Sequence, residues 1–294
     1  MSWTELQQIE QALRDGSENI SVSAILIDSD HHHHLQPLVT DTTEHHQRDD
    51  VTVIIPTHRR VPVGLDAFVE QSRHVQILLN GAVDIPHIPN VQVRLLSWKG
   101  HGRTRQEALK HVHTPYVFFT VDDAIPLPNC LERLVTEIEQ SDWDAVIARQ
   151  IPFPTADRYT KDQLALWTPH CDAPYRVAQC DHVGTLYRTE TLKEHPIPDV
   201  PIAEDAWWSV NKGVGCVPSA CIVHSHPRRT VALMKREYAI HKQLKAISQN
   251  SSDTSTIELG AMFRGTIHAT VQYGVKEGLR VTAQNLARFA AHKL

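Results

Sequence analysis

The sequence predicts an α/β protein whose mostly parallel sheet is flanked by helices and followed by further helices at the carboxyl end. Three patterns support this prediction. Short apolar runs alternate with segments of helical spacing over residues 51–150, as in βαβ units. Several of these runs are apolar throughout, as in strands buried on both faces. Residues 229–248 and 256–293 show helical spacing alone.

The first fifty residues are expected to form an extension. Ser2 and Glu5 form a candidate capping box at the start of a helix, and residues 20–27 alternate as a half-buried strand does. Residues 28–50 are polar and rich in histidine. These histidines could bind Zn²⁺ or Ni²⁺, but structural zinc sites normally include cysteine and the segment has none. We therefore interpret it as a solvated loop.

Strands and helices are expected to alternate over residues 51–150. The first strand, at 51–56, is expected to end at its proline. Further strands are predicted at 75–79, 91–96, 116–121 and 143–148, and helices at 62–72, 103–113 and 129–140. The last helix places four apolar side chains on one face, Leu131, Leu134, Val135 and Ile138.

The second half is less regular. Residues 151–200 contain many prolines and little periodicity. A helix is predicted to start near Glu204 and a strand to follow from residue 215, before the two carboxyl-terminal helices.

Composition excludes several function classes. The chain has 294 residues and a net charge of -5, which argues against nucleic-acid binding. No apolar run is long enough for a membrane span, and the amphipathic start of the chain does not resemble a secretory signal. Five scattered cysteines do not suggest a disulfide framework, so we expect a cytoplasmic protein.

Acidic and histidine residues follow the predicted strands. Asp122 and Asp123 come directly after an apolar run, where adjacent carboxylates can hold a divalent cation; the alternative is a solvated turn or a helix cap. Glu204 and Asp205 open a helix, and capping is again the alternative. One tryptophan of the following Trp-Trp pair is expected to line a cleft.

Two further groups are candidate metal ligands. His224 and His226 lie two residues apart and so face the same side of a strand. Cys180 and His182, with a second soft pair at 170–171, form a weaker zinc candidate, because the spacing fits no standard finger. We interpret that second group as unrelated core and surface residues.

In this order, the segments resemble the family-2 type of inverting glycosyltransferases with the GT-A fold. The resemblance covers residues 51–244 and depends on VTVIIPTHRR, LLNGA, GHGRTRQEALKHVHTPYVFFTVDDAIPLPNCLERL, AED and VHSHP. The HSHP segment and the basic-aromatic helix at 228–241 are most similar to rhamnosyltransferase-type members.

The resemblance implies roles for single residues. It makes Asp205 the catalytic base and Glu204 its partner, and Asp123 the metal ligand, with His226 as a further ligand or a diphosphate contact. It places the nucleotide sugar against Pro56, Thr57, Arg59, Asn80, Arg105 and Asp122. It also implies a nucleotide-sugar-binding half at 51–150, an acceptor-side half at 151–228 and carboxyl-terminal helices at 229–294.

The implied activity is transfer of a sugar from a nucleotide-diphosphate sugar to an acceptor hydroxyl with inversion, assisted by Mn²⁺ or Mg²⁺. The acceptor is left open among glycans, lipid-linked molecules and other hydroxyl compounds, as is peripheral membrane association. Two departures bear on the assignment. Leu79 replaces the usual aspartate before Asn80, and the acidic motif is one acid shorter than the common pattern. A non-catalytic sugar-nucleotide or glycan-binding module is the alternative, and a metal-buffering protein is remote.

Overall fold

The computed structural model describes residues 47–248 and 259–293, apart from residues 59, 82, 84, 86, 97–99, 155 and 226–229. The predicted extension with its helix, strand and histidine-rich loop lies almost entirely outside the described residues.

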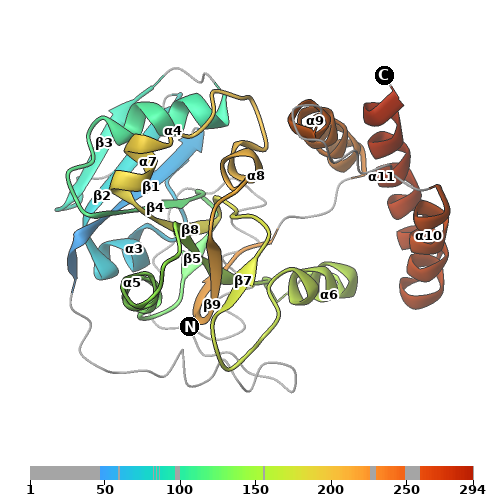
Figure 1. The fold of residues 1–294 in the computed structure, drawn as a ribbon, viewed down its shortest axis with the longest axis horizontal. Helices are drawn as coiled ribbons and strands as arrows, with labels where there is room; N and C mark the ends of the chain where they lie inside the picture. Colours follow the sequence, from blue (N-terminus) through green and yellow to red (C-terminus); the bar gives the residue numbers. More distant parts are fainter. Residues whose placement is uncertain are drawn as a thin grey trace.

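A single mixed sheet organises the chain (Figure 1). Its order is β3-β2-β1-β4-β8-β6-β9-β5, with β7 paired to β9. The strands are β1 Arg48–His58, β2 Ser72–Asn80, β3 Val91–Leu95, β4 Tyr116–Thr120, β5 Ile125–Pro126, β6 Ala145–Ile151, β7 Tyr175–Val177, β8 Gly184–Arg188 and β9 Val214–Val223. The pairs β1-β2, β1-β4, β2-β3 and β6-β9 are parallel, whereas β8 is antiparallel to both of its neighbours. The α/β prediction is confirmed.

The first strand does not end at Pro56, as the sequence pattern predicts, but continues to His58. Proline lacks an N–H group and is tolerated in a strand where no ladder bond needs one. The pairing of β1 with β4 stops at Ile54, whereas the pairing with β2 continues to His58. Pro56 therefore lies beyond the two-sided part of the ladder. The extra residues carry Thr57 to the edge where the strands end.

Helices cover both faces of the sheet and bury two apolar clusters. On one face, α3 (Leu65–Gln71) and α5 (Cys130–Gln140) pack against β-strand residues, and α5 buries the predicted stripe. On the other face lie α4 (His101–Leu109), α7 (Thr189–Glu194) and α8 (Glu204–Trp208). The helices predicted in the first half are confirmed.

Residues 151–200 contain more structure than the sequence pattern predicts. They form α6 (Arg158–Trp167), β7, β8 and α7. The Asp157 side chain caps α6 by accepting a hydrogen bond from the Thr160 N–H, at 2.8 Å. No residue of α6 is fully buried, so the helix lacks the strong apolar stripe that would have revealed it.

Three helices end the chain: α9 (Thr230–Ser248), α10 (Leu259–Tyr273) and α11 (Val275–Lys293). The continuous helix predicted at 256–293 is wrong, because Gly274 separates α10 from α11. Its φ of 92° lies in the left-handed region, where glycine commonly ends a helix. α9 and α10 each pack against α11.

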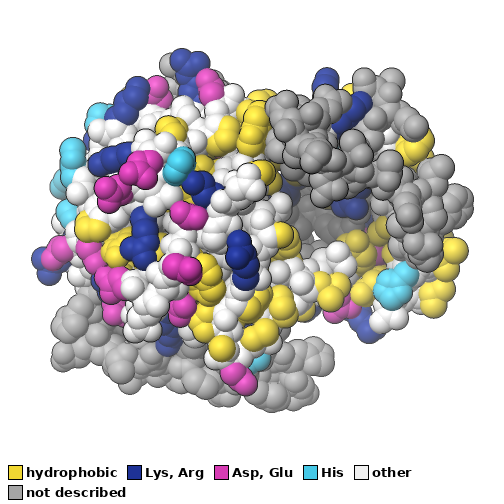
Figure 2. Space-filling model, in the orientation of Figure 1, with side chains coloured by type: hydrophobic (Ala, Val, Ile, Leu, Met, Phe, Trp, Pro, Cys, Tyr) yellow, Lys and Arg dark blue, Asp and Glu magenta, His cyan; other side chains and the backbone are white. Residues whose placement is uncertain are grey.

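Apolar side chains gather at the right-hand end of the molecule, over α10 and α11 (Figure 2). The exposed large apolar side chains of these two helices are Ile267, Val271, Val275, Leu279 and Leu286. Among the residues that the structure describes, no helix combines the length and apolar character needed to cross a membrane.

Candidate active site

The acidic turn after β4 is held in place by the segment after β1. The Val63 N–H donates to the Asp122 carbonyl at 2.9 Å. Gly64 approaches so closely that a Cβ there would lie 2.2 Å from the Ala124 carbonyl oxygen. Any side chain at position 64 would therefore displace the turn. This contact fixes the position of the two carboxylates before any ligand binds.

The Asp122 carboxylate is already paired. The Thr57 hydroxyl lies 2.7 Å from Oδ2, and Arg60 grips both carboxylate oxygens through Nε, at 2.7 Å, and Nη2. Such a bidentate pair is strong and directional. Asp122 therefore positions Arg60, and its oxygens are engaged within the protein.

Asp123 lies between a cation and an imidazole. Its Oδ2 is 3.7 Å from Arg60 Nη2, and its Oδ1 is 3.6 Å from His224 Nε2. The other ring nitrogen of His224 lies 3.2 Å from the Gln150 side-chain oxygen, which fixes the ring orientation. His224 is the member of the predicted histidine pair that the structure places here. His226 lies outside the described residues.

Asp123 and its neighbours form a partial ligand set, of the kind that binds a metal ion together with a phosphate-containing substrate. No group of three or more candidate metal ligands occurs within the described part of the chain. Mg²⁺, however, is commonly bound through one or two carboxylates together with substrate phosphates. Asp123, with His224 beside it, supplies such a partial set, and a diphosphate would supply the remaining oxygens.

Glu204 is buried in an ion-pair cluster. Its Oε1 lies 2.9 Å from Arg105 Nη1 and 2.9 Å from His182 Nδ1, and all three side chains are almost fully buried. Burial by itself would raise the pKa of Glu204. The hydrogen bond from His182 and the charge of Arg105 outweigh that effect, so the pKa of Glu204 is lowered. Glu204 is thus an ionised group that anchors α8 to α4.

Asp205 follows Glu204 in helix α8. Ala203, two residues before Asp205, has a φ of 61°, an unfavourable conformation for a residue with a side chain. Asp205 is half-buried, and its Oδ1 accepts the Ala206 N–H at 2.8 Å. It lines a cleft of about 1010 Å³ between the sheet and helices α6, α9 and α11. Val121 and His224 line the same cleft, so the acidic turn is at its border.

A second carboxyl group adjoins Asp205. Asp181 is half-buried, and desolvation followed by the charge of Asp205 raises its pKa. It accepts hydrogen bonds from the Val183 N–H and the Gln150 side chain. Because Gln150 also contacts His224, a line of polar side chains runs from Asp123 to Asp181 along the carboxyl edge of the sheet.

The other predicted residues are distributed along this edge. Pro56 and Thr57 are near the end of β1, and Asn80 ends β2 opposite His58. Arg105 lines the cleft while it pairs with Glu204. Arg59 lies outside the described residues.

The weaker sequence candidates have structural roles. Cys180 Sγ lies 3.0 Å from both the Tyr187 and Ser209 hydroxyls, and His182 contacts Glu204, so neither is available for a shared zinc ion. Trp208 packs in the core, where its indole N–H donates to the His195 carbonyl at 2.8 Å.

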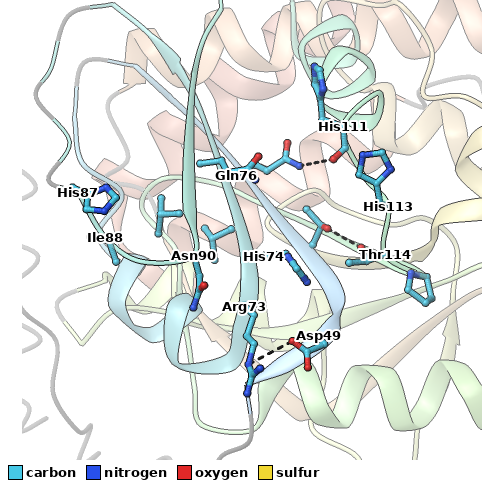
Figure 3. A pocket seen from close by; sticks show the side chains of 15 residues that line it. Asp49, Arg73, His74, Gln76, His87, Ile88, Asn90, His111, His113 and Thr114 are labelled. Atoms are coloured by element: carbon cyan, nitrogen blue, oxygen red, sulfur yellow. Dashed lines mark hydrogen bonds and ion pairs between the residues drawn. The ribbon is translucent and has the colours of Figure 1, made fainter.

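A second hollow, of about 730 Å³, lies at the opposite edge, where β1, β2 and β3 begin (Figure 3). The Gln76 amide donates to the His111 carbonyl at 3.0 Å, and Arg73 pairs with Asp49 at 3.4 Å. None of the predicted site residues that the structure describes lines this hollow. The candidate active site therefore lies at the carboxyl edge of the sheet.

Comparison with known proteins bears on the family and on the fold. Residues 75–187, which include the acidic turn, match the family model described as glycosyl transferase family 2. The chain resembles the family 2 glycosyltransferases. Its GT-A fold is confirmed by solved structures. A search of curated proteins finds no match.

Three solved structures illustrate the likeness. A mannosyltransferase from Pyrobaculum calidifontis, in complex with GDP-Man and Mn²⁺, is 14% identical with a TM-score of 0.54, covering 97% of this chain and 94% of its own. S. aureus TarS with UDP-GlcNAc is 13% identical with a TM-score of 0.51, covering 83% and 89%. GalNAc-T7 with UDP, GalNAc and Mn²⁺ is 10% identical with a TM-score of 0.51, covering 90% and 66%. The likeness to rhamnosyltransferases stays a prediction.

Sequence reasoning missed several residues of this GT-A site. Arg60 was visible only as one of two arginines after the first strand, and nothing local indicated its pairing with Asp122. His182 was weighed as a zinc ligand with Cys180, although its partner is Glu204. Gly64 gave no signal, because its role depends on a contact with a distant segment.

Proposed function

We propose that the protein transfers a sugar from a nucleotide-diphosphate sugar to an acceptor hydroxyl with inversion, using Asp205 as the base. The observation that carries this proposal is the placement of Asp205. Both Asp205 and Glu204 line the cleft, but Glu204 is buried and paired with Arg105 and His182, whereas Asp205 is half-buried. A carboxylate can accept the proton from an acceptor hydroxyl during attack on the anomeric carbon. Direct attack needs no enzyme nucleophile and inverts that carbon.

Glu204 has a positioning role in this proposal. Its charge pairs with Arg105, and its backbone belongs to the same short helix as Asp205. The buried pair fixes the helix, and with it the direction of the Asp205 carboxylate. The sequence-based assignment of Glu204 as the partner of the base is retained in this indirect form.

The donor is proposed to bind between the ends of β1 and β2 and the acidic turn, against Pro56, Thr57, Asn80 and Asp122. Arg59 and Arg105 complete the proposed set. Asp123 would hold Mn²⁺ or Mg²⁺, with His224 beside it and His226 as the further predicted ligand. When bound, the cation offsets negative charge that develops on the departing diphosphate.

The two sides of the cleft are proposed to bind different substrates. Residues 51–150 are proposed to bind the nucleotide sugar, and residues 151–228 with the helices at 229–294 to form the acceptor side. Helices α6, α9 and α11 line the cleft opposite the sheet, which supports this division. Glycans, lipid-linked molecules and other hydroxyl compounds remain the candidate acceptors, and a hexosyl or deoxyhexosyl group the candidate cargo.

A two-stage experiment tests the proposal. Thermal-shift assays with UDP-, GDP- and dTDP-sugars, each with Mn²⁺, identify the donor, because a ligand bound to the native state raises its melting temperature. Proton NMR of the products then gives the anomeric configuration. Inverted configuration supports the mechanism, and retained configuration contradicts it. Binding without turnover across an acceptor panel would favour the non-catalytic module.

A further inference from the structure

The Arg60 guanidinium occupies the space between two carboxylates that are expected to serve different ligands. Its Nε and Nη2 edge is paired with Asp122, and Nη2 lies 3.7 Å from Asp123. The Arg60 side chain nevertheless remains 36% exposed. Within the part of the chain that the structure describes, its third nitrogen, Nη1, makes no hydrogen bond. One edge of the guanidinium is thus fixed by the protein, and the N–H groups of Nη1 make no hydrogen bond to any described residue.

The fixed edge gives this cation a defined position. Asp122 is held by a hydrogen bond from Thr57 and by the backbone contact from Val63, so the carboxylate that pairs with Arg60 is itself supported by the protein. A preorganised guanidinium loses little conformational entropy when it binds an anion. Guanidinium groups also match the geometry of phosphate oxygens.

The charge balance of the turn has a further consequence. Two adjacent carboxylates repel each other and would attract a divalent cation strongly. Arg60 neutralises much of this field at Asp122 and lies within reach of Asp123. Its presence therefore weakens binding of a free divalent cation and favours binding of an anion at the same place.

We propose that Arg60 is a diphosphate-binding residue, held by Asp122 beside Asp123, so that the donor diphosphate binds through this guanidinium as well as through a divalent cation. The inference rests on the proposed function, because it takes the nucleotide-diphosphate donor as the ligand. It goes beyond it by giving the site a protein cation that is present without metal. It also assigns Asp122 to holding that cation.

Two binding measurements on Arg60→Gln test the inference. In the first, electron paramagnetic resonance follows the binding of Mn²⁺ alone. The variant should bind Mn²⁺ roughly tenfold more tightly than the parent, because a positive charge near Asp123 is removed. In the second, calorimetry measures UDP, GDP and dTDP in EDTA. The variant should lose roughly tenfold in metal-free affinity for whichever diphosphate binds the parent best.

Two further variants serve as controls. Arg73→Gln removes an arginine from an exposed ion pair at the opposite edge of the sheet and should change neither value. Arg60→Lys keeps the charge but loses the two-pronged geometry. It should restore the weak Mn²⁺ binding of the parent and only part of the diphosphate affinity. Circular dichroism verifies that each variant is folded.

The outcomes separate the two proposals. If no nucleoside diphosphate binds the parent with or without Mn²⁺, the proposed function fails, and the inference about the diphosphate fails with it. If a diphosphate binds the parent but Arg60→Gln leaves its metal-free affinity unchanged, only the role of Arg60 is overturned. Equal Mn²⁺ affinity in parent and Arg60→Gln overturns that role as well.

Discussion

Replacing Arg105 by Met tests whether the buried ion pair anchors α8. Arg105 and Glu204 side chains are only 3% and 5% exposed, and their charged atoms lie 2.9 Å apart. Removing one partner leaves the other charge buried without full compensation, which typically costs about 3–5 kcal/mol. We therefore predict a loss of this size in the free energy of unfolding, measured by urea denaturation.

The same helix provides a matched control. Arg103 and Asp199 also form an arginine–carboxylate pair, but at 3.5 Å and with side chains 49% and 55% exposed. Exposed pairs contribute about 0–1 kcal/mol. Arg103→Met should accordingly cost far less than Arg105→Met.

A double-mutant cycle separates the pair from the other contacts of Arg105, such as its stacking over Phe119. Arg105→Met, Glu204→Gln and the double variant should give a coupling free energy of about 2 kcal/mol. An Arg105→Met variant no less stable than Arg103→Met, or a coupling near zero, would refute the anchoring role.

Three further predictions concern the site and its supports. Asp123→Ala should abolish the Mn²⁺-dependent part of nucleotide binding in calorimetry, whereas undiminished Mn²⁺ dependence would remove Asp123 from the metal site. Gly102→Ala should lower the free energy of unfolding by roughly 1–3 kcal/mol in urea titrations, because a Cβ at position 102 would lie 1.9 Å from the Pro198 carbonyl oxygen. An unchanged free energy of unfolding would mean that the backbone moves aside at no cost. Burial lowers the pKa of His101, although Glu204 opposes this. The unfolded chain therefore binds that proton more readily, so stability should fall as pH drops below about 6.5, and His101→Gln should flatten this slope in denaturation measured from pH 7 to 5.

Much of the fold of residues 51–150 was predictable because its signals are local. The apolar run of β4 and the acids that follow it are contiguous in sequence, and a buried strand delivers them to one edge. The stripe of α5 likewise predicts its buried face. The prediction that the first strand ends at Pro56 is wrong. Whether a strand residue needs a backbone N–H for the ladder depends on where the neighbouring strand stops, and the local sequence does not show this.

The parts that were not predictable depend on distant contacts. Arg60 meets Asp122 across 62 positions, and Arg105 meets Glu204 across 99. No spacing rule links such residues. Helix α6 was hidden because it buries no complete side chain. The break at Gly274 was readable in principle, since glycine favours such positions, but helical spacing continues on both sides of it.

The central claim is that Asp205 is the proton acceptor of a sugar transfer. The most direct test is the rate of nucleoside-diphosphate release from the identified sugar nucleotide, in the parent, in Asp205→Asn and in the exposed control Asp199→Asn. The account predicts a fall of roughly 10²-fold or more for Asp205→Asn alone, with donor affinity unchanged, because an amide cannot accept the proton. A rate for Asp205→Asn equal to that of the parent would contradict the claim and leave Asp205 as part of a helix terminus.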